Sequence, residues 1–474
     1  MKHTPATAPI GAGGAAATVG REATAELRRK ARDFVERSAE AAREGGLALT
    51  VAAVAVPVEH FLRALPDAPA FSFAPAGGLA MATLGEAASL EVSASPEGMA
   101  AARRELSRYF DRFSHRVAPG ALEVTPRALV GLAFEPEAAP AAPFEELGRG
   151  RLVLPRWTYW SDGARAALTL ALSPEEAFDR ARALAELDAL FDALDAPPPA
   201  APFPPVVEEA ATEPAEWNAL VELVHAALRR GEASKIVVSR RKAVRAAGPL
   251  DPTAVFSRIG EAPEGATRFF VRRGATTFLG CTPEHLFEKR GRTLETEALA
   301  GSIGAGEADG EAKLKASEKD LGEHARVVEH IVARLEPLCT EVKASETPRI
   351  RRLPTVLHLR TPIAATLAEG VDALTVVEAL HPTPAVGGTP ADFARRFIAQ
   401  HEPSRGWYAA PIGFVDARGD AEFFVALRCL VARGDEAHLF AGAGIVAASE
   451  AALEWEETKL KMRPMMRALG VGEG

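Results

Sequence analysis

The seven residues Ser234-Lys235-Ile236-Val237-Val238-Ser239-Arg240 have the composition of a buried β-strand. Side chains alternate along a strand, so Lys235, Val237 and Ser239 share one face. A lysine inside a strand core is costly unless it is paired or neutral. Desolvation and nearby cations lower the pKa of lysines, which allows them to act as general bases. The alternative interpretation is a lysine on an edge strand whose ammonium group reaches water.

The overall composition restricts the classes of protein to which the chain can belong. Its 474 residues are 47% hydrophobic and 25% charged, which is typical of a globular protein with a large core. The formal net charge of -9 argues against a nucleic-acid partner, and no apolar run is long enough for a membrane span. The three sparse cysteines form neither a zinc motif nor a disulfide framework, and they predict a cytoplasmic protein.

A proline-rich stretch marks the main boundary in the sequence. Residues 195–205 contain six prolines in eleven positions, which predicts an extended linker. We expect a disordered tail over residues 1–20, an α/β region over 21–205 and a second region over 206–474. Expected elements of the second region include a helix over 318–335, a strand over 421–430 and a final helix from about residue 449. Strands and helices are mixed without strict alternation, which favours an α+β fold with mostly antiparallel sheets.

A glutamate stands among apolar residues in the segment Cys281-Thr282-Pro283-Glu284-His285-Leu286. A predicted strand ends at the proline turn just before it. Burial would raise the pKa of the Glu284 carboxyl and keep it protonated, as a proton donor requires. The alternative is a glutamate in the first turn of a helix, where it would only complement the helix dipole.

Two predicted helices each carry paired carboxylates on one face. Asp320 and Glu323 are three residues apart, as are Glu454 and Glu457, and Lys461 extends the second face. Such helices could together hold Mg2+, which takes one or two protein carboxylates and keeps its other positions for water and substrate. The alternative is two solvated acidic faces.

Two glycines, Gly442 and Gly444, follow a strand predicted over residues 438–441. Glycine permits close approach of an anion to backbone N–H groups. The segment lacks the third glycine and the βαβ context of a dinucleotide-binding fingerprint.

Taken together and in this order, nine segments between residues 213 and 466 resemble the chorismate-utilising enzymes. These are Ser-Lys-Ile-Val-Val-Ser-Arg (234–240), Cys-Thr-Pro-Glu-His-Leu (281–286), Ala-Leu-Ala-Gly-Ser (298–302), Ser-Glu-Lys-Asp-x-x-Glu-His (317–324), His-Pro-Thr-Pro-Ala-Val-Gly-Gly (381–388), Arg-Gly-Trp-Tyr (405–408), Ala-Leu-Arg (426–428), Gly-Ala-Gly-Ile-Val (442–446) and Glu-Trp-Glu-Glu-Thr-x-x-Lys (454–461). The resemblance implies large antiparallel sheets flanked by helices. It also implies that residues 21–205 pack on the chorismate-binding region, 206–474.

Three positions distinguish the subgroups of this family. Lys235 matches the lysine of the isochorismate and salicylate synthases, whereas enzymes that use ammonia typically have a glutamine-like residue there. Ala300 stands where aminodeoxychorismate synthases resemble one another in a nucleophilic lysine. Salicylate synthases usually differ from the pattern at residues 381–388. The resemblance therefore implies isochorismate synthase activity.

The resemblance also implies a role for each matched residue. Lys235 would deprotonate the water that attacks C2 of chorismate, and Glu284 would protonate the departing C4 hydroxyl. Mg2+ would be held by Glu323 and Glu457, with Asp320 and Glu454 orienting its waters. The matched substrate-binding positions are Gly301, Ser302, His358, Tyr408, Arg428, Gly442, Gly444 and Lys461.

Two of these substrate-binding assignments, those of His358 and Lys461, meet a specific objection. His358 has the alternative of a hydrogen-bonded core histidine. Pro464 should kink or end the last helix just after Lys461.

Three rival functions remain open at this level. A salicylate synthase would use similar residues and then eliminate pyruvate. An anthranilate-synthase-like subunit would need a glutaminase partner, against which Lys235 argues. A non-catalytic paralogue would be expected to lack the acid, the base or the metal ligands. No nicotinamide, flavin or pyridoxal cofactor is implied. The sequence does not separate a menaquinone from a siderophore or other salicylate-derived pathway, and it leaves the oligomeric state open.

Overall fold

The computed structural model describes residues 13–38, 46–111, 113–172, 179–195, 203–352 and 356–471. The first half contains α1 Gly13–Ser38, β1 Leu47–Ala53, α2 Val58–Ala64, β2 Ala70–Pro75, β3 Ala80–Glu91, α3 Pro96–Phe110, β4 Ser114–Val117, β5 Arg127–Leu132, β6 Gly150–Ser161, β7 Ala166–Leu172 and α4 Arg180–Asp195. The second half begins with β8 Val206–Ala211, α5 Pro214–Arg229, β9 Lys235–Ala246, α6 Pro252–Arg258, β10 Thr267–Arg273, β11 Thr276–Thr282, β12 His285–Arg290, β13 Thr293–Gly304, α7 Gly310–Ala316 and α8 Glu318–Leu335. It continues with η3 Glu336–Leu338, β14 Cys339–Ala344, β15 Arg349–Arg352, β16 Val356–Leu367, α9 Ala373–Leu380, β17 Gly388–Thr389, α10 Ala391–His401, β18 Pro411–Asp416, β19 Ala421–Val425, β20 Cys429–Arg433, β21 Glu436–Ile445 and α11 Ala451–Ala468.

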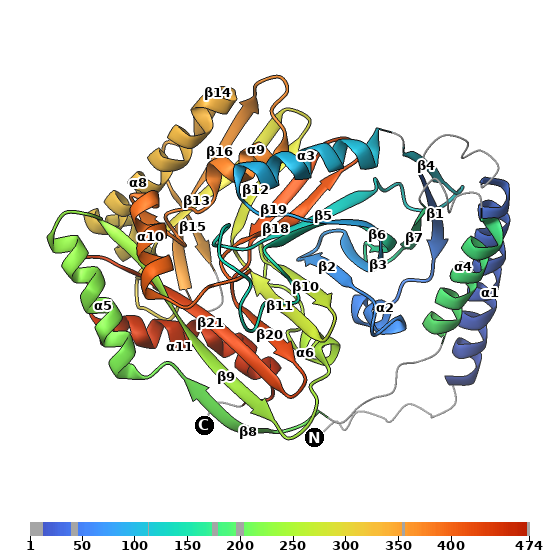
Figure 1. The fold of residues 1–474 in the computed structure, drawn as a ribbon, viewed down its shortest axis with the longest axis horizontal. Helices are drawn as coiled ribbons and strands as arrows, with labels where there is room; N and C mark the ends of the chain where they lie inside the picture. Colours follow the sequence, from blue (N-terminus) through green and yellow to red (C-terminus); the bar gives the residue numbers. More distant parts are fainter. Residues whose placement is uncertain are drawn as a thin grey trace, which may run out of the picture.

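Fifteen of the described strands form one continuous series of hydrogen-bonded neighbours. From β8 the series passes through β9, β21, β20, β11, β10, β2, β3, β6, β5, β18, β19, β12 and β13 to β16. Among the described pairings, β1 with β4 is parallel and the others are antiparallel. Helices such as α3, α5, α8 and α11 lie on the outside of the strands (Figure 1). The predicted α+β fold with large antiparallel sheets flanked by helices is therefore confirmed.

Two strand pairings join the two halves of the chain. β2 pairs with β10, and β5 pairs with β18. The proline-rich stretch therefore separates two parts of the sequence whose strands belong to the same hydrogen-bonded series. Helix α1 begins at Gly13, so residues 13–20 are helical where a disordered tail was expected. Residues 1–12 of that tail and 196–202 of the linker lie outside the described residues.

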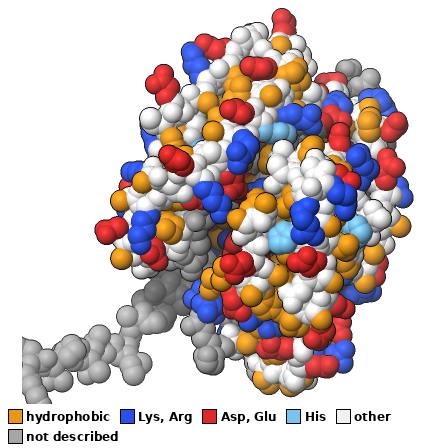
Figure 2. Space-filling model, turned by 90° about the vertical axis from the view of Figure 1, so that its left-hand side faces the viewer, with side chains coloured by type: hydrophobic (Ala, Val, Ile, Leu, Met, Phe, Trp, Pro, Cys, Tyr) orange, Lys and Arg blue, Asp and Glu red, His pale blue; other side chains and the backbone are white. Residues whose placement is uncertain are grey.

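The surface of the molecule carries charges of both signs. Acidic and basic side chains are interspersed over the face seen in Figure 2. None of the described helices combines the length and the apolar content needed to cross a membrane.

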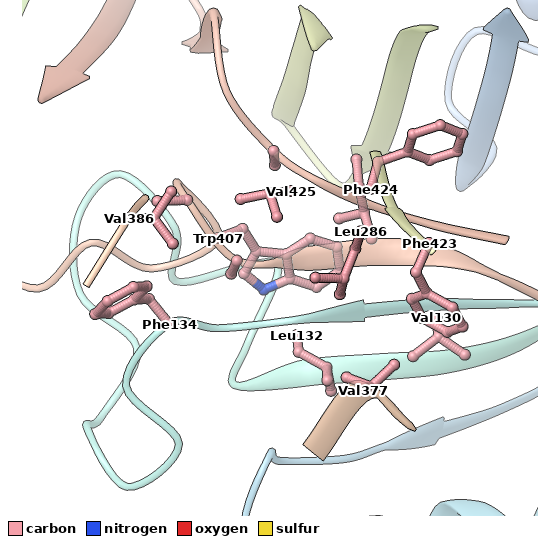
Figure 3. Packing of buried hydrophobic residues seen from close by; sticks show 14 of the residues in the cluster. Val130, Leu132, Phe134, Leu286, Val377, Val386, Trp407, Phe423, Phe424 and Val425 are labelled. Carbon is pink, nitrogen blue, oxygen red and sulfur yellow. The ribbon is translucent and has the colours of Figure 1, made fainter. Parts of the chain in front are cut away.

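A core around Trp407 fixes the chain next to the candidate site. The indole is fully buried and has Leu132, Phe134 and Val386 around it (Figure 3). Its Nε1 donates to the carbonyl of Gly148 at 3.0 Å. A Cβ at Gly131 would lie 2.0 Å from the ring, so only glycine leaves room for it there. The packing of Trp407 thus fixes the position of Tyr408, the next residue in the sequence.

Pro464 was expected to kink or end the last helix, but α11 runs from Ala451 to Ala468 with Pro464 inside it, so the helix does not end just after Lys461. Proline inside a helix removes one hydrogen bond and costs about 3 kcal/mol. Met465 and Ala468, which follow the proline, are at most 1% exposed. Burial of these side chains requires the helix to continue, and this packing outweighs the local cost.

We expect Leu132→Ala to lower the free energy of unfolding by about 2–5 kcal/mol, because it leaves a cavity in the fully buried core. The matched control is Leu223→Ala on α5, where the side chain is 45% exposed and the loss should stay below about 1 kcal/mol. Denaturant midpoints followed by tryptophan fluorescence would measure both. Equal shifts in the two variants would contradict this description of the core.

Candidate active site

One cavity of about 430 Å³ gathers the predicted site residues from distant parts of the chain. Its walls come from β9, β13, β16, β21, α8, α11 and the segments that precede β12, β18 and β20. The backbone of Ser302 lies in β13 opposite His358, and its side chain is outside the described residues. The other predicted residues all line the cavity, namely Lys235, Glu284, Gly301, Asp320, Glu323, His358, Tyr408, Arg428, Gly442, Gly444, Glu454, Glu457 and Lys461.

Lys235 opens strand β9, which has partners on both sides. β21 pairs along one edge, and β17 and β8 pair along the other, so the edge-strand alternative is wrong. The Lys235 side chain is 17% exposed, and its Nζ donates to Glu323 Oε1 at 2.8 Å. The lysine is therefore a partly desolvated group that is paired with a carboxylate on α8.

The two predicted glycines lie within β21 itself and not in a loop that follows it. A Cβ at Gly444 would lie 2.5 Å from Lys235 Cε, and one at Gly442 would lie 2.9 Å from the carbonyl oxygen of Val238. Because Gly444 has no side chain, Lys235 can extend across the neighbouring strand β21 and reach the cavity. This steric role differs from the expected donation of backbone N–H groups to an anion.

Glu284 lies between β11 and β12, so the helix-terminus alternative is wrong. Its backbone N–H donates to Thr282 Oγ1 at 3.2 Å. Burial, and then the negative charge of Glu297, raise the pKa of the Glu284 carboxyl to about 7, against the opposing effect of Arg351. Such a carboxyl is partly protonated near neutral pH, as a general acid requires.

Glu297, on β13, was not singled out from the sequence. Its carboxylate accepts hydrogen bonds from both Arg351 and Arg360, and its side chain is only 6% exposed. The two guanidinium groups hold this carboxylate in place close to Glu284. Since Glu295 precedes it on the same strand, the sequence offered no signal that separates the two glutamates.

The four carboxylates predicted to bind metal come from α8 and α11 and face the same cavity. Although burial acts in the opposite direction, Lys235 lowers the pKa of Glu323, and Lys461 lowers that of Glu457 from 2.5 Å away. Burial and the charge of Glu457 raise the pKa of Glu454. In the part of the chain that the structure describes, no group of three or more His, Cys, Asp or Glu side chains is arranged to hold a metal ion. The two lysines instead neutralise the two carboxylates, and the metal site stays a prediction.

The opposite wall of the cavity carries hydrogen-bond donors. Arg428 interrupts the strand predicted over 421–430, because its φ of 49° lies in the left-handed region. Its carbonyl accepts from the Cys281 N–H at 3.2 Å, which holds this strained backbone in place. Burial lowers the pKa of Arg428 and raises that of Tyr408. A neutral tyrosine and a desolvated guanidinium are suited to binding a carboxylate.

His358 lies on β16 at the edge of the same wall. Burial, and then the positive charge of Arg428, lower the pKa of His358 to about 4, so its ring is neutral at physiological pH. It lines the cavity, which distinguishes it from a histidine that is enclosed in the core. A neutral imidazole can donate or accept a hydrogen bond without adding charge to the site.

A buried ion pair beneath the cavity was also missed. Arg405 and Glu402 are each 1% exposed and lie 2.9 Å apart. Arg405 also donates to the carbonyl of Val237 at 2.8 Å, and Glu402 accepts from the N–H and hydroxyl of Ser239 at 3.0 and 2.6 Å. The pair thus fixes β9 against the segment that leads to Tyr408. In the sequence, only the Arg-Gly-Trp-Tyr motif (405–408) indicated that Arg405 belongs to a functional segment.

We expect Glu297→Gln to lower the pKa of Glu284 from about 7, because it removes a nearby negative charge and releases Arg351 to act on the carboxyl. A titration of ¹³C-labelled glutamate carboxyl groups by NMR would measure the change. The matched control, Glu295→Gln, alters an exposed residue of the same strand and should leave the titration unchanged. An unchanged pKa in the Glu297 variant would show that burial alone sets the value.

Comparisons with known proteins identify the family of this chain. The family model described as chorismate binding enzyme matches residues 34–470. The salicylate biosynthesis isochorismate synthase of Pseudomonas aeruginosa is 41% identical over 55% of this chain and 56% of its own length. Isochorismate synthase MenF of Escherichia coli is 33% identical over 65% of this chain and 73% of its own. The chain thus spans little more than half the length of the first of these relatives.

The fold has a close match among solved structures. The structure of MenF, the menaquinone-specific isochorismate synthase from Escherichia coli, superposes with a TM-score of 0.76 and 27% identity. The match covers 93% of this chain and 99% of that one. The family model, the relatives and the fold all identify the same group of proteins, and the chain belongs to the chorismate-binding enzymes.

Proposed function

We propose that this protein is a Mg2+-dependent isochorismate synthase, which isomerises chorismate to isochorismate. The observation that carries the proposal is the presence of Lys235 and Glu284 in one cavity with Arg428 and Tyr408. An amine, a carboxyl with a pKa near 7 and two anion-binding groups are what this displacement requires. The relatives named isochorismate synthase support the same activity.

In the proposed reaction, water adds to C2 of the ring, the two conjugated ring double bonds each shift by one position, and the hydroxyl group leaves C4. Lys235 accepts the proton of the attacking water, and Glu284 gives its proton to the departing hydroxyl. Arg428, Tyr408 and Lys461 hold the dianionic substrate. One water enters and one leaves, so the product is an isomer of the substrate. To act as a base, Lys235 must release Glu323, to which it donates in this structure.

The cavity has suitable donors for the metal that the family implies. Glu323 and Glu457 would hold Mg2+, while Asp320 and Glu454 would orient its waters, because carboxylate oxygens are the ligands that this cation prefers. A bound cation would supply positive charge for the substrate carboxylate. Binding of Glu323 to a cation is also compatible with the release of Lys235 that the base role demands.

The sequence also supports a proposal for the cellular location of the enzyme and for its need of a partner subunit. The three cysteines are free, which fits a cytoplasmic location. A lysine in the base position makes an ammonia-supplying glutaminase partner unnecessary.

We expect Lys235→Ala and Glu284→Gln each to reduce turnover of chorismate by at least about 100-fold, since general bases and acids contribute factors of this size. In the unaltered protein, activity should fall as pH rises through about 7, because Glu284 then loses its proton. Product chromatography with mass detection, in Mg2+ and without ammonia, would follow the reaction. Full activity of either variant would refute its assigned role, and salicylate plus pyruvate as main products would indicate a salicylate synthase.

The metal assignment is tested by Glu457→Gln. We expect this variant to bind Mg2+ at least about tenfold more weakly in a calorimetric titration, because it removes one anionic ligand. The matched control is Glu456→Gln on the adjacent, exposed position, which should bind as the unaltered protein does. Equal affinity in all three proteins would exclude Glu457 from the metal site.

A further inference from the structure

A second cavity, of about 380 Å³, lies beside the elements that form the candidate active site. Its walls are β8, β9, α11 and Val471, and these elements run next to one another in Figure 1. Lys235 and Arg240 occupy opposite faces of β9, because side chains alternate along an uninterrupted strand. Helix α11 also contributes to both cavities: Glu454 and Glu457 line the first, and Trp455 lines the second. One strand and one helix therefore separate the two cavities.

The second cavity contains a buried arginine with little compensation for its charge. Arg240 is only 4% exposed, and its guanidinium stacks on the ring of Trp455 at 3.8 Å. Its Nε donates to Thr458 Oγ1 at 2.5 Å. Among the described residues, the structure gives Arg240 no ion pair and its two terminal nitrogens no hydrogen-bond acceptor. Burial lowers the pKa of Arg240 to about 10, although Glu456 opposes the effect.

The surrounding charge is also positive. Five basic side chains and two acidic ones line the cavity, although the whole chain has a net charge of -9. The two acidic residues are each neutralised locally, Glu209 by Lys242 at 2.6 Å and Glu456 by Lys459 at 2.6 Å. Arg467, which is exposed on the same wall, makes no ion pair with a described residue. The cavity thus has positive charge in excess.

The rest of the lining indicates the kind of anion that would fit. Trp455, Met462 and Met466 supply apolar and polarisable surface next to the guanidinium of Arg240. A volume near 380 Å³ falls within the range of pockets that bind small molecules. An anionic head group could pair with the terminal nitrogens of Arg240, and an apolar body could lie on the methionines.

We propose that this cavity is a second ligand site, which binds a small organic anion through Arg240 and Arg467. The head group is a carboxylate or a phosphate, both of which match the planar donors of a guanidinium. The site is separate from the substrate cavity and does not depend on the reaction proposed above. Since α11 and β9 line both cavities, its occupant would contact the elements that carry Glu457 and Lys235.

Calorimetric titration of the full chain with benzoate and, separately, with inorganic phosphate tests this site. We expect saturable binding of one or both, with Arg240→Gln weakening it at least about tenfold, because a buried charged hydrogen bond is lost. Arg467→Gln should weaken it about threefold and cannot create a buried defect, so it keeps the test valid if the first variant folds poorly. Tighter binding of benzoate than of phosphate would assign a carboxylate ligand, and the reverse order a phosphate.

Two control variants identify the cavity that is responsible. Arg104→Gln alters an exposed arginine of α3 outside both cavities and should leave binding unchanged. Arg428→Ala alters the substrate cavity and should also retain the binding lost in Arg240→Gln. Loss of binding in Arg428→Ala with retention in Arg467→Gln would overturn the proposal, as would the absence of saturable binding of either probe.

Discussion

Charge pairing inside a partly desolvated cavity is the constraint on which the rest of this structure depends. Charged groups that leave water must find partners, or their ionisation changes. Lys235 and Glu323 form one such pair, and Lys461 and Glu457 form another. Glu284 forms no ion pair with a described residue, and burial together with the charge of Glu297 raises its pKa to about 7. The same physical rule thus produces ion-paired lysines and a carboxyl that can hold a proton in one cavity.

The backbone explains how these groups can meet at all. Gly444 gives Lys235 space to cross β21, and the left-handed conformation of Arg428 breaks a strand at the cavity wall. The Arg405–Glu402 pair ties β9 to the segment that leads to Tyr408. These backbone features and this ion pair determine the shape of the cavity wall.

The sequence predicted features that local pattern determines. The Lys235 strand, the α8 helix and the shared faces of α8 and α11 follow from periodicity, and the ordered motifs identified the family. Features that depend on distant partners were missed. The influence of Glu297 on Glu284 requires the pairing of strands that local composition does not specify. Pro464 predicted a kink or an end of the helix because its local cost is visible in the sequence, whereas the burial of Met465, which favours continuation of the helix, is not.

The central claim is that water, activated in this cavity, replaces the C4 hydroxyl of chorismate by attack at C2. The most direct test is to incubate the protein with chorismate and Mg2+ in H2¹⁸O, without ammonia, and to separate the isomers before mass analysis. The account predicts isochorismate in which one oxygen atom is ¹⁸O, with no such product from Lys235→Ala. Isochorismate without the label, or anthranilate formed only when ammonia is added, would contradict it.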